Sequence, residues 1–532
     1  MKVDKYSSVW VAVLGIIVGI LLVLTVQKCD DVRNKTVKIP AGTWQKLNLV
    51  LKNVVDNYVD TVDFDSLTDA AIVGALSDLD PHTVYMPPVE LEESETELAG
   101  NFDGIGIQFN VPNDTAIVLE VIPGGPSEKI GLQKGDRLLK VNDKEIAGVK
   151  FPQDSMVRRM KGPAGTKVTV TIQRGDEVIP FEITRGKIPV NSIDAYFMID
   201  DTTGYIRLSK FARTTTTEIV SAGADLLGQG MKHLIFDLRD NSGGYFDQAL
   251  NLSNLFLEKG SKIVYMEGLH RDREDYTADG RGFMKDVKLS VLISEGSASS
   301  SEIFAGAIQD NDRGVIFGRR SFGKGLVQEP VYFSDGSGVR VTVARFYTPS
   351  GRCIQKPYDK DYEYDILKRY TAGEMVDADS IKVNKDEEYH TSGGRTVYGG
   401  GGIVPDVFVP LDTTRATDFY VQCNRKATTM RFASSYFDRH RAALSSIEDY
   451  DALMSYLNNA GLDKEFLAFA ASKDGIKPSD NTEWVKSSEY MMPQIKALVG
   501  RYSKLGEKAF YHIYLDIDNV VAEAMKPHAL NM

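Results

Sequence analysis

LSVLISEGSASSSEIFAGAIQDN, residues 289–311, is a continuous apolar run that passes directly into a helical pattern. The same order occurs earlier, where HLIFDLR (233–239) precedes DQALNLSNLFLEKG (247–260), and another apolar run, GVIFG, follows at 314–318. Strands that are apolar throughout and separated by helices are typical of a sheet buried on both faces. We therefore expect residues 188–410 to form an α/β core with a partly parallel sheet.

The segments on either side of this core have other patterns. Strand-like segments separated by Gly, Pro and Asp turns predict a compact, mostly antiparallel domain over residues 100–187. Helical periodicity predicts a helical N-terminal domain at 43–99 and a helical C-terminal region at 411–532. Residues 28–42 form a polar linker, and a charged, tyrosine-rich insertion at 358–390 is expected to be an exposed arm of the core. The fold class is therefore multidomain α+β.

The N-terminus contains a candidate membrane anchor. Residues 9–26 (VWVAVLGIIVGILLVLTV) carry no charge and are long enough to span a bilayer. Lys2 and Lys5 precede the run, which favours a cytoplasmic start. We expect residues 1–27 to be an uncleaved, single-pass anchor in a bacterial inner membrane, with the catalytic part in the periplasm. A cleaved signal peptide is the alternative, although no A-x-A-like site follows; a lipoprotein anchored through Cys29 is disfavoured by the lysine before it.

Composition limits the classes of function. The 532-residue chain is 42% hydrophobic and 26% charged, as folded proteins are, and its net charge is −12. Without a basic block, nucleic acid is not expected as a partner. Three cysteines and seven scattered histidines indicate neither a disulfide framework nor a metal site.

Ser299 and Lys324 are the first candidates for chemistry. Ser299 lies at the expected turn from strand to helix, where the free N–H groups of a helix start can stabilise an oxyanion. A serine hydroxyl needs a neighbouring base to become a good nucleophile. Lys324, in the turn FGKG (322–325), can be that base if burial lowers its pKa from the usual value of about 10.4.

Both residues also have simpler interpretations. Ser299 and Glu302 fit the S-x-x-E capping box, which explains them as a helix start. Lys324 lies in a segment close to a phosphate-binding P-loop, but Gly325 replaces the Ser or Thr that would hold Mg²⁺. Spacing alone therefore favours a cap for Ser299 and argues against nucleotide binding.

The loop Asp240–Gly244 (DNSGG) follows a buried strand. It superficially resembles the nucleophile loop of trypsin-like peptidases, which would make Ser242 the nucleophile. That chemistry needs His and Asp upstream on a double barrel, and neither His82 nor His233 lies in such a pattern. The two glycines fit better as a loop of backbone donors, with a simple turn as the alternative.

Gly104-Ile105-Gly106-Ile107 opens a strand, and GLQKGDRLLKVN follows at 131–142. Together these segments resemble a PDZ domain, in which a Gly-containing loop captures a peptide carboxylate beside a groove that adds the ligand as a strand. Either segment alone also fits a generic hairpin. The resemblance makes all four residues of the first segment candidates for peptide binding.

Several motifs, in this order, resemble the C-terminal processing (tail-specific) serine peptidases. They are LDPH (79–82), the PDZ-like domain, DLRDNSGG (237–244), GSASSSE (296–302), FGKG (322–325) and GGGIVPD (400–406). The similarity covers roughly residues 45–410. It implies a crotonase-like ββα fold for the peptidase core and no metal or cofactor.

The resemblance also implies the catalytic residues. Ser299 would be the nucleophile, Lys324 its general base, and Gln328 a third member that orients the lysine. The implied function is a serine endopeptidase that cleaves envelope proteins or peptides.

The implied oxyanion donors are the N–H of Ser300 and that of Gly243 or Gly244. Many relatives have alanine where this chain has Ser300, which leaves a backbone donor unaffected. The implied substrates have free C-termini that the PDZ domain binds. A non-catalytic PDZ scaffold is the alternative function, and the sequence leaves formation of a homo-oligomer open.

Overall fold

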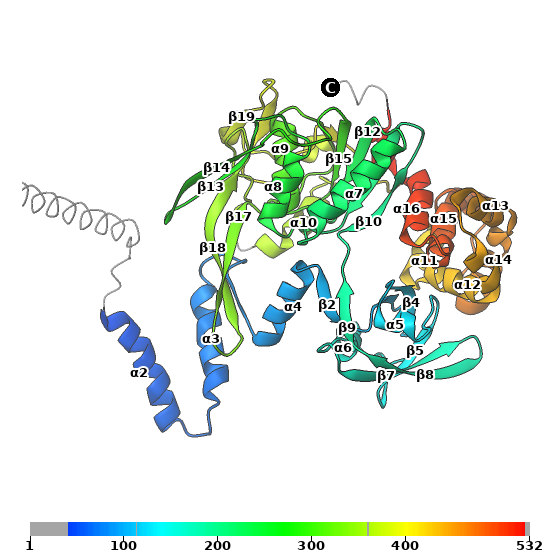
Figure 1. The fold of residues 1–532 in the computed structure, drawn as a ribbon, viewed down its shortest axis with the longest axis horizontal. Helices are drawn as coiled ribbons and strands as arrows, with labels where there is room; N and C mark the ends of the chain where they lie inside the picture. The colour runs from blue at the N-terminus through cyan, green and yellow to red at the C-terminus, as the bar shows by residue number, and fades with distance from the viewer. Residues whose placement is uncertain (1–40, 113, 359–360, 527–532) are drawn as a thin grey trace, which may run out of the picture.

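A computed structural model describes residues 41–112, 114–358 and 361–526 (Figure 1). The predicted anchor, residues 1–27, lies outside them, as does most of the predicted linker at 28–42. Among the described residues, no helix is both long and apolar enough to cross a membrane.

The core is a six-stranded sheet in the order β10-β11-β12-β15-β16-β21. Its strands are Ile193–Met198, Thr203–Leu208, His233–Asp237, Lys288–Ile293, Val315–Gly318 and Val407–Phe408. Neighbouring strands from β11 to β21 are parallel, and β10 is antiparallel to β11. The central strands are buried nearly throughout, which is why they are apolar on both faces.

Helices cover both faces of this sheet. On one face lie α7 (Thr215–Gly228), α8 (Phe246–Asn254) and α9 (Ser300–Asp310), which share one core with β12 and β15. Every residue of α9 is buried. On the other face, α17 (Asn519–Ala524) packs against β15 and β16. The helix that follows the predicted nucleophile is therefore held on all sides.

A second, antiparallel sheet has the order β1-β18-β13-β14, and β17 pairs with β18. The strands are Val84–Met86, Gly338–Tyr347, Lys262–Gly268, Arg271–Thr277 and, for β17, Leu326–Tyr332. Periodicity predicts helices for segment 43–99, but the segment also contains the strand β1. Its short strand ends before two prolines, and Met86 in it is buried.

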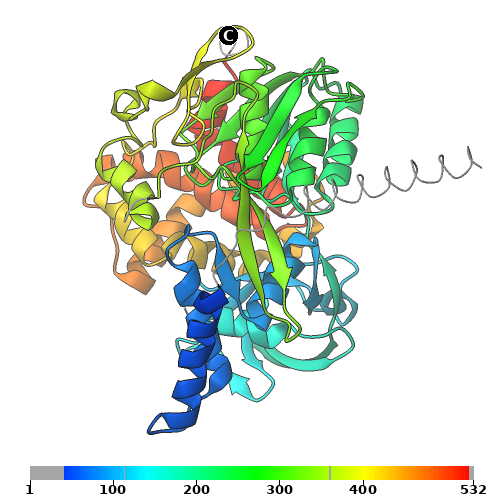
Figure 2. The ribbon, with the colours of Figure 1, turned by 90° about the vertical axis from the view of Figure 1, so that its left-hand side faces the viewer.

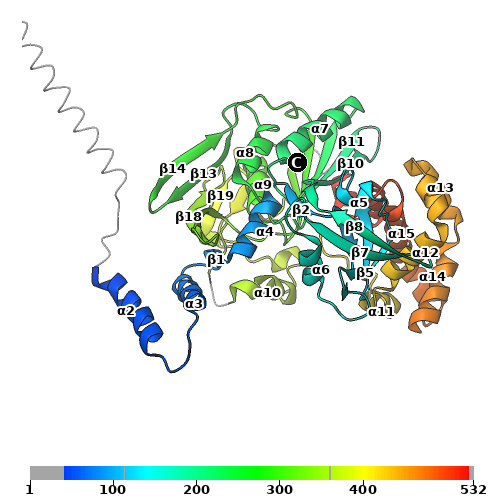
Figure 3. The ribbon, with the colours of Figure 1, turned by 60° about the horizontal axis from the view of Figure 1, so that its bottom comes forward.

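The N-terminal helices are α2 (Ala41–Asn57), α3 (Phe64–Leu76) and α4 (Pro88–Leu98). Asp63 caps α3 by accepting a hydrogen bond from Asp65 N–H at 3.1 Å. No residue of α3 is buried, and Leu49 and Val59 of this segment are 67% and 87% exposed. In Figures 2 and 3 the dark blue α2 extends away from the body of the molecule.

The β-rich domain contains a sheet in the order β3-β4-β5-β7-β8, with β6 beside β5. Its strands are Ile107–Asn110, Ala116–Val121, Arg137–Val141, Lys167–Arg174, Glu177–Thr184 and, for β6, Lys144–Glu145. β2 (Asn101–Gly104) pairs with β9 (Gly186–Pro189) and brings the two ends of the domain together. The helices are α5 (Pro126–Lys129) and α6 (Gln153–Met160), and α6 packs on the core of the domain through Met156 and Met160.

Most residues in the described part of the insertion at 358–390 are exposed, as its composition predicts, but a few are buried against the core. Its described part contains α10 (Asp365–Thr371), the 3-10 turns Tyr362–Tyr364, Ala378–Ser380 and Lys385–Glu387, and β19 (Glu388–His390), which pairs with β20 (Thr396–Tyr398). Arg369 is buried and donates to the carbonyl oxygens of Arg320 at 2.6 Å and Ser321 at 3.0 Å. Glu374 pairs with both arginines. Arg369 and Glu374 thus hold the insertion to the segment that leads into Lys324, which composition could not reveal.

The C-terminal region is helical, as predicted. Its helices are α11 (Asp418–Arg425), α12 (Thr428–Ser446), α13 (Tyr450–Asn459), α14 (Leu462–Phe469), α15 (Asn481–Tyr502), α16 (Glu507–Tyr514) and α17, with a π-helical turn at Ala470–Asp474 and a 3-10 turn at Leu515–Ile517. Apart from α17, which packs on the core sheet, they form a core of their own, which Ile117 of the β-rich domain joins. Figure 1 shows these orange and red helices beside both the β-rich domain and the core sheet.

Candidate active site

Ser299 stands between β15 and α9, at the turn that the sequence predicts. Its backbone has φ 55° and ψ −114°, a conformation that costs a residue with a Cβ about 1–3 kcal/mol. Ala298 N–H donates to the Asn241 carbonyl oxygen at 3.0 Å, and Ser297 Oγ donates to that of Leu238 at 2.7 Å. These contacts with the loop after β12 hold the strained turn in place.

The buried carboxylate of Glu302 joins the Ser299 turn to the loop that carries Lys324. One oxygen, Oε2, accepts the N–H groups of Ser299 and Lys324, each at 2.9 Å. The other, Oε1, accepts the Ser321 hydroxyl at 2.5 Å and the Gly323 N–H at 2.7 Å. Burial raises the pKa of Glu302, and these donors oppose the rise. Glu302 therefore does cap the helix start, but it also fixes the FGKG turn beside it.

The structure brings Lys324 and Gln328 together. Lys324 Nζ donates to Gln328 Oε1 at 3.0 Å, and Gln328 Nε2 donates to the carbonyl oxygen of His82. The second bond holds the Gln328 amide with its oxygen facing the lysine. In the described part of the chain no hydrogen bond joins Nζ to Ser299; hydrogen bonds of active sites are often loose before substrate binds.

The environment of Lys324 favours its neutral form. Burial lowers its pKa first, because the ammonium loses water, and the positive charge of Arg340 lowers it further. The carboxylates of Asp80 and Glu302 oppose this shift. His82 adds no charge at neutral pH, since burial lowers its own pKa to about 4.

Gly243 lies directly against the nucleophile turn. A Cβ placed on Gly243 would lie 2.9 Å from Ser299 Cβ and 2.9 Å from Ser300 N. Its φ of 100° also strongly favours glycine. The space in front of the Ser300 N–H thus exists because residue 243 has no side chain.

The three predicted donor groups differ in availability. Gly243 N–H donates to Asn241 Oδ1 at 2.9 Å. The N–H groups of Ser300 and Gly244 have no acceptor among the described residues. Ser300 Oγ donates to the carbonyl oxygen of Gly244 at 3.0 Å, so this side chain helps to hold the loop.

Comparisons with known proteins give three family matches and several relatives. Residues 202–364 match peptidase family S41, residues 104–184 match the PDZ domain, and residues 419–503 match a family described only as being of unknown function. The "Probable CtpA-like serine protease" of Staphylococcus aureus (strain N315) is 33% identical over 354 residues, which cover 66% of this chain and 71% of the relative. Its counterpart in a strain of Staphylococcus epidermidis is 33% identical over 347 residues, 64% of this chain and 70% of the relative.

The chain belongs to peptidase family S41. It is a CtpA-like serine peptidase of the C-terminal processing type and carries a PDZ domain. Among solved structures, the photosystem II D1 C-terminal processing protease is 26% identical, with a TM-score of 0.37, over 70% of this chain and 94% of that one.

The predicted peptide-binding residues of the S41 peptidase line one groove in the PDZ domain. It holds about 160 Å³ and lies between β3 and α6. Its lining is Phe102, Gly104–Phe109, Val157, Met160 and Lys161. Gly106 has φ 78°, which explains the glycine, and the carbonyl oxygens of Ile105 and Gly106 bond back to the domain at 3.0 Å. The groove is mostly apolar, with one lysine at its edge.

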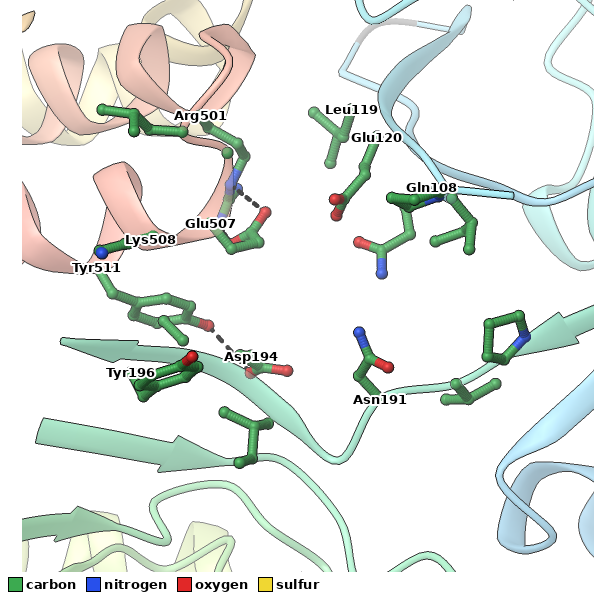
Figure 4. A pocket seen from close by; sticks show the side chains of 18 of the residues that line it. Gln108, Leu119, Glu120, Asn191, Asp194, Tyr196, Arg501, Glu507, Lys508 and Tyr511 are labelled. Atoms are coloured by element: carbon green, nitrogen blue, oxygen red, sulfur yellow. Dashed lines mark hydrogen bonds and ion pairs between the residues drawn. The ribbon is translucent and has the colours of Figure 1, made fainter. Parts of the chain in front are cut away.

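A larger cavity of about 830 Å³ lies between the PDZ domain, the peptidase core and the C-terminal helices (Figure 4). It contains none of the three predicted catalytic residues. Carboxylates from all three parts, Glu120, Asp194 and Glu507, face it, but Arg501 lies 2.7 Å from Glu507 and the Tyr511 hydroxyl donates to Asp194 at 3.3 Å. The cavity marks where the three parts of the S41 peptidase meet.

Sequence reasoning missed several contacts of the site. Nothing in the sequence showed that Asn241 would occupy the Gly243 N–H, or that His82 would hold the Gln328 amide. The S-x-x-E pattern gave one of the four bonds of Glu302. Within the described residues, no group of three or more His, Cys, Asp or Glu side chains is suited to a metal ion.

Proposed function

We propose that this S41 peptidase is an endopeptidase that uses Ser299 as nucleophile and Lys324 as general base. The observation that carries the proposal is the Glu302 carboxylate, one oxygen of which lies 2.9 Å from the backbone nitrogens of both residues. The sheet of parallel strands covered by helices supports a crotonase-like core for this site.

The proton transfers follow from the position of Lys324. Neutral Nζ takes the proton of Ser299 Oγ as the hydroxyl attacks the scissile carbonyl carbon, and the resulting ammonium gives that proton to the leaving amine. Water then hydrolyses the acyl-enzyme through the same base. Gln328 accepts one Nζ hydrogen and so directs the lone pair of the neutral amine away from itself.

The N–H groups of Ser300 and Gly244 are the donors for the oxyanion in this proposal, because neither has an acceptor among the described residues. Preorganised donors of this kind contribute about 2.7–4 kcal/mol each to transition-state stability. Gly243, whose N–H is engaged by Asn241, contributes open space in front of Ser300.

The PDZ groove supports substrates with a free, apolar C-terminus. The Gly104–Ile107 loop would receive the carboxylate, and the Lys161 ammonium at the edge of the groove adds an opposite charge. Ile107, Val157 and Met160 would contact the terminal apolar side chain.

We also propose that residues 9–26 anchor the enzyme in a bacterial inner membrane with its catalytic part in the periplasm. The support is the uncharged 18-residue run. Resistance of the membrane-bound enzyme to alkaline extraction tests the anchor, and release by alkali would contradict it.

We also propose that the enzyme can form a homo-oligomer, which the exposed apolar side chains of α2 and α3 support.

Cleavage of an unfolded reporter with an apolar tail tests the function. Wild type and Ser242→Ala should cleave it, while Ser299→Ala and Lys324→Ala should not. Full turnover by Ser299→Ala would refute the mechanism, and no turnover by any form would favour a non-catalytic scaffold. Amidation of the reporter's C-terminus should raise KM, since the PDZ loop would lose the carboxylate.

A further inference from the structure

The C-terminal helices contact both other parts of the molecule. On the PDZ side, Arg137 pairs with Asp438 at 2.5 Å, and Lys134 Nζ donates to the carbonyl oxygen of Ser503 at 3.1 Å. On the side of the core, the His512 ring stacks on Phe197 with centroids 4.3 Å apart. The C-terminal region is therefore built into the body of the enzyme.

One of these contacts reaches the end of β12. Asp518, in the turn before α17, accepts two hydrogen bonds from the Arg239 guanidinium, at 3.0 Å and 2.6 Å. The same carboxylate caps α17 by accepting the N–H groups of Val520 and Val521. The side chain of Asp518 is 5% exposed and that of Arg239 is 16% exposed, so the pair is largely shielded from water.

Arg239 is fixed on its other side by Asp237. The guanidinium donates to both Asp237 oxygens, at 2.9 Å and 2.6 Å, and the Arg239 N–H donates to one of them at 2.9 Å. The fully buried Asp237 also accepts bonds from Tyr205 at 2.7 Å and Arg207 at 3.0 Å. Two arginines therefore share Asp237, and Asp518 supplies a second negative charge to the group.

The loop of the active site starts at the next residue. Asp240 has φ 62°, a left-handed conformation that is uncommon for residues with a Cβ but that aspartate tolerates better than most. On one side Asp240 is held by Ser294 Oγ, 2.9 Å from its N–H. On the other side Arg239 is held by Asp237 and Asp518. The loop from here to Gly244 lies against Ser299 and Ser300.

We propose that Asp518 is a positioning residue of the peptidase: through Arg239 it holds the Asp240–Gly244 loop against the nucleophile turn. The last turn and helix of the described chain are thus part of the active unit. The predicted effect of Asp518 on turnover rests on the proposed function. Its predicted effect on the position of the loop rests on the structure alone.

The variant Asp518→Asn tests it, because asparagine caps a helix as well as aspartate does but lacks the charge that holds Arg239. Asn519→Ala is the matched control. It removes the bond from Asn519 Nδ2 to the Pro410 carbonyl oxygen at the same turn and leaves Arg239 untouched. We expect Asp518→Asn to lower kcat at least tenfold with KM within twofold, and Asn519→Ala to keep kcat.

A double-mutant cycle shows whether Asp518 acts through Arg239. In the Arg239→Gln background, Asp518→Asn should lower kcat no further. The inference is refuted if Asp518→Asn lowers kcat equally in both backgrounds, or if it leaves kcat unchanged on its own. The proposed function is judged separately, by whether the wild type turns over the reporter faster than the Ser299→Ala blank.

Hydrogen exchange measures the loop without any turnover. In the Ser299→Ala form, Asp518→Asn should speed amide exchange in residues 240–245 at least tenfold relative to Asn519→Ala. Equal exchange in the two variants would overturn the positioning role, whether or not the enzyme cleaves the reporter.

Discussion

Replacing Glu302 by glutamine perturbs the connection between the nucleophile turn and the lysine loop. The carboxylate accepts four donors: the N–H groups of Ser299, Gly323 and Lys324 and the Ser321 hydroxyl. Glutamine has the same shape but only one acceptor oxygen, and its NH₂ group would face two of these donors. With the NH₂ group toward Ser299 and Lys324, two hydrogen bonds are lost. With it toward Ser321 and Gly323, the Ser321 hydroxyl can accept from it, and only the bond of Gly323 is lost.

The magnitude follows from the type of bond. Hydrogen bonds to a charged acceptor contribute about 1.5–3 kcal/mol each, so losing one or two weakens the connection by about 1.5–6 kcal/mol. A shift of the dyad by about 1 Å costs up to ~10²-fold in rate. We therefore expect Glu302→Gln to lower kcat by about 100-fold while the protein remains folded.

Steady-state kinetics on the tailed reporter, with circular dichroism as a check on folding, measure this effect. Glu295→Gln is the matched control: this carboxylate is partly buried, pairs with Arg319 at 2.8 Å and lies four residues before Ser299, but bonds to neither dyad residue. The control should keep kcat within about threefold. A folded Glu302→Gln enzyme with the same kcat as the control would refute the reasoning.

Three further predictions test other parts of the site. Gly243→Ala should lower kcat/KM at least ~10²-fold, because its Cβ would lie 2.9 Å from Ser300 N. Gly260→Ala is the control, since Gly260 also has a positive φ, 84°, but open space where a Cβ would lie. Equal kcat/KM in the two variants would contradict the prediction. Since only the neutral lysine is a base, the rate should rise with pH through the pKa of Lys324. Arg340→Gln should move this rise to higher pH and Asp80→Asn to lower pH, and an unmoved profile in both would be evidence against Lys324 as the base. His512 stacks on Phe197 and Tyr450, and burial lowers its pKa from 6.5 to about 4. The unfolded chain then binds the proton more readily, so the free energy of unfolding should fall as pH drops from 6.5 to 4, by no more than ~3 kcal/mol. In thermal unfolding, Tm should fall less steeply with pH in His512→Phe than in the wild type. Equal dependence of Tm on pH in the two proteins would count against a contribution of His512.

The sequence predicts the succession of strands and helices in the core well, because the strands are continuous apolar runs. β12, β15 and β16 are apolar on both faces, as buried parallel strands must be, and the turn at Ser299 follows directly from the boundary between strand and helix. The FGKG turn and the Gly243–Gly244 pair are likewise visible, because glycine marks backbone that approaches another segment closely.

Long-range contacts between polar side chains could not be predicted. Arg369 and Glu374 look solvated in a charged insertion, but they are buried through mutual pairing and bonds to backbone carbonyls. The Asp518–Arg239 pair joins positions 279 apart in the sequence, and no local pattern connects them. Even Glu302, which its spacing marks as a cap, gains its second role only when the loop before β17 folds against the start of α9.

The most direct test of the dyad is covalent labelling of the full-length enzyme by a serine-reactive fluorophosphonate, followed by peptide mass spectrometry. The account predicts a single adduct on Ser299 in the wild type, formed faster as pH rises through the pKa of Lys324, and at least 100-fold slower labelling in Lys324→Met. An adduct on Ser242, or labelling of Ser299 at an unchanged rate in Lys324→Met, would contradict it.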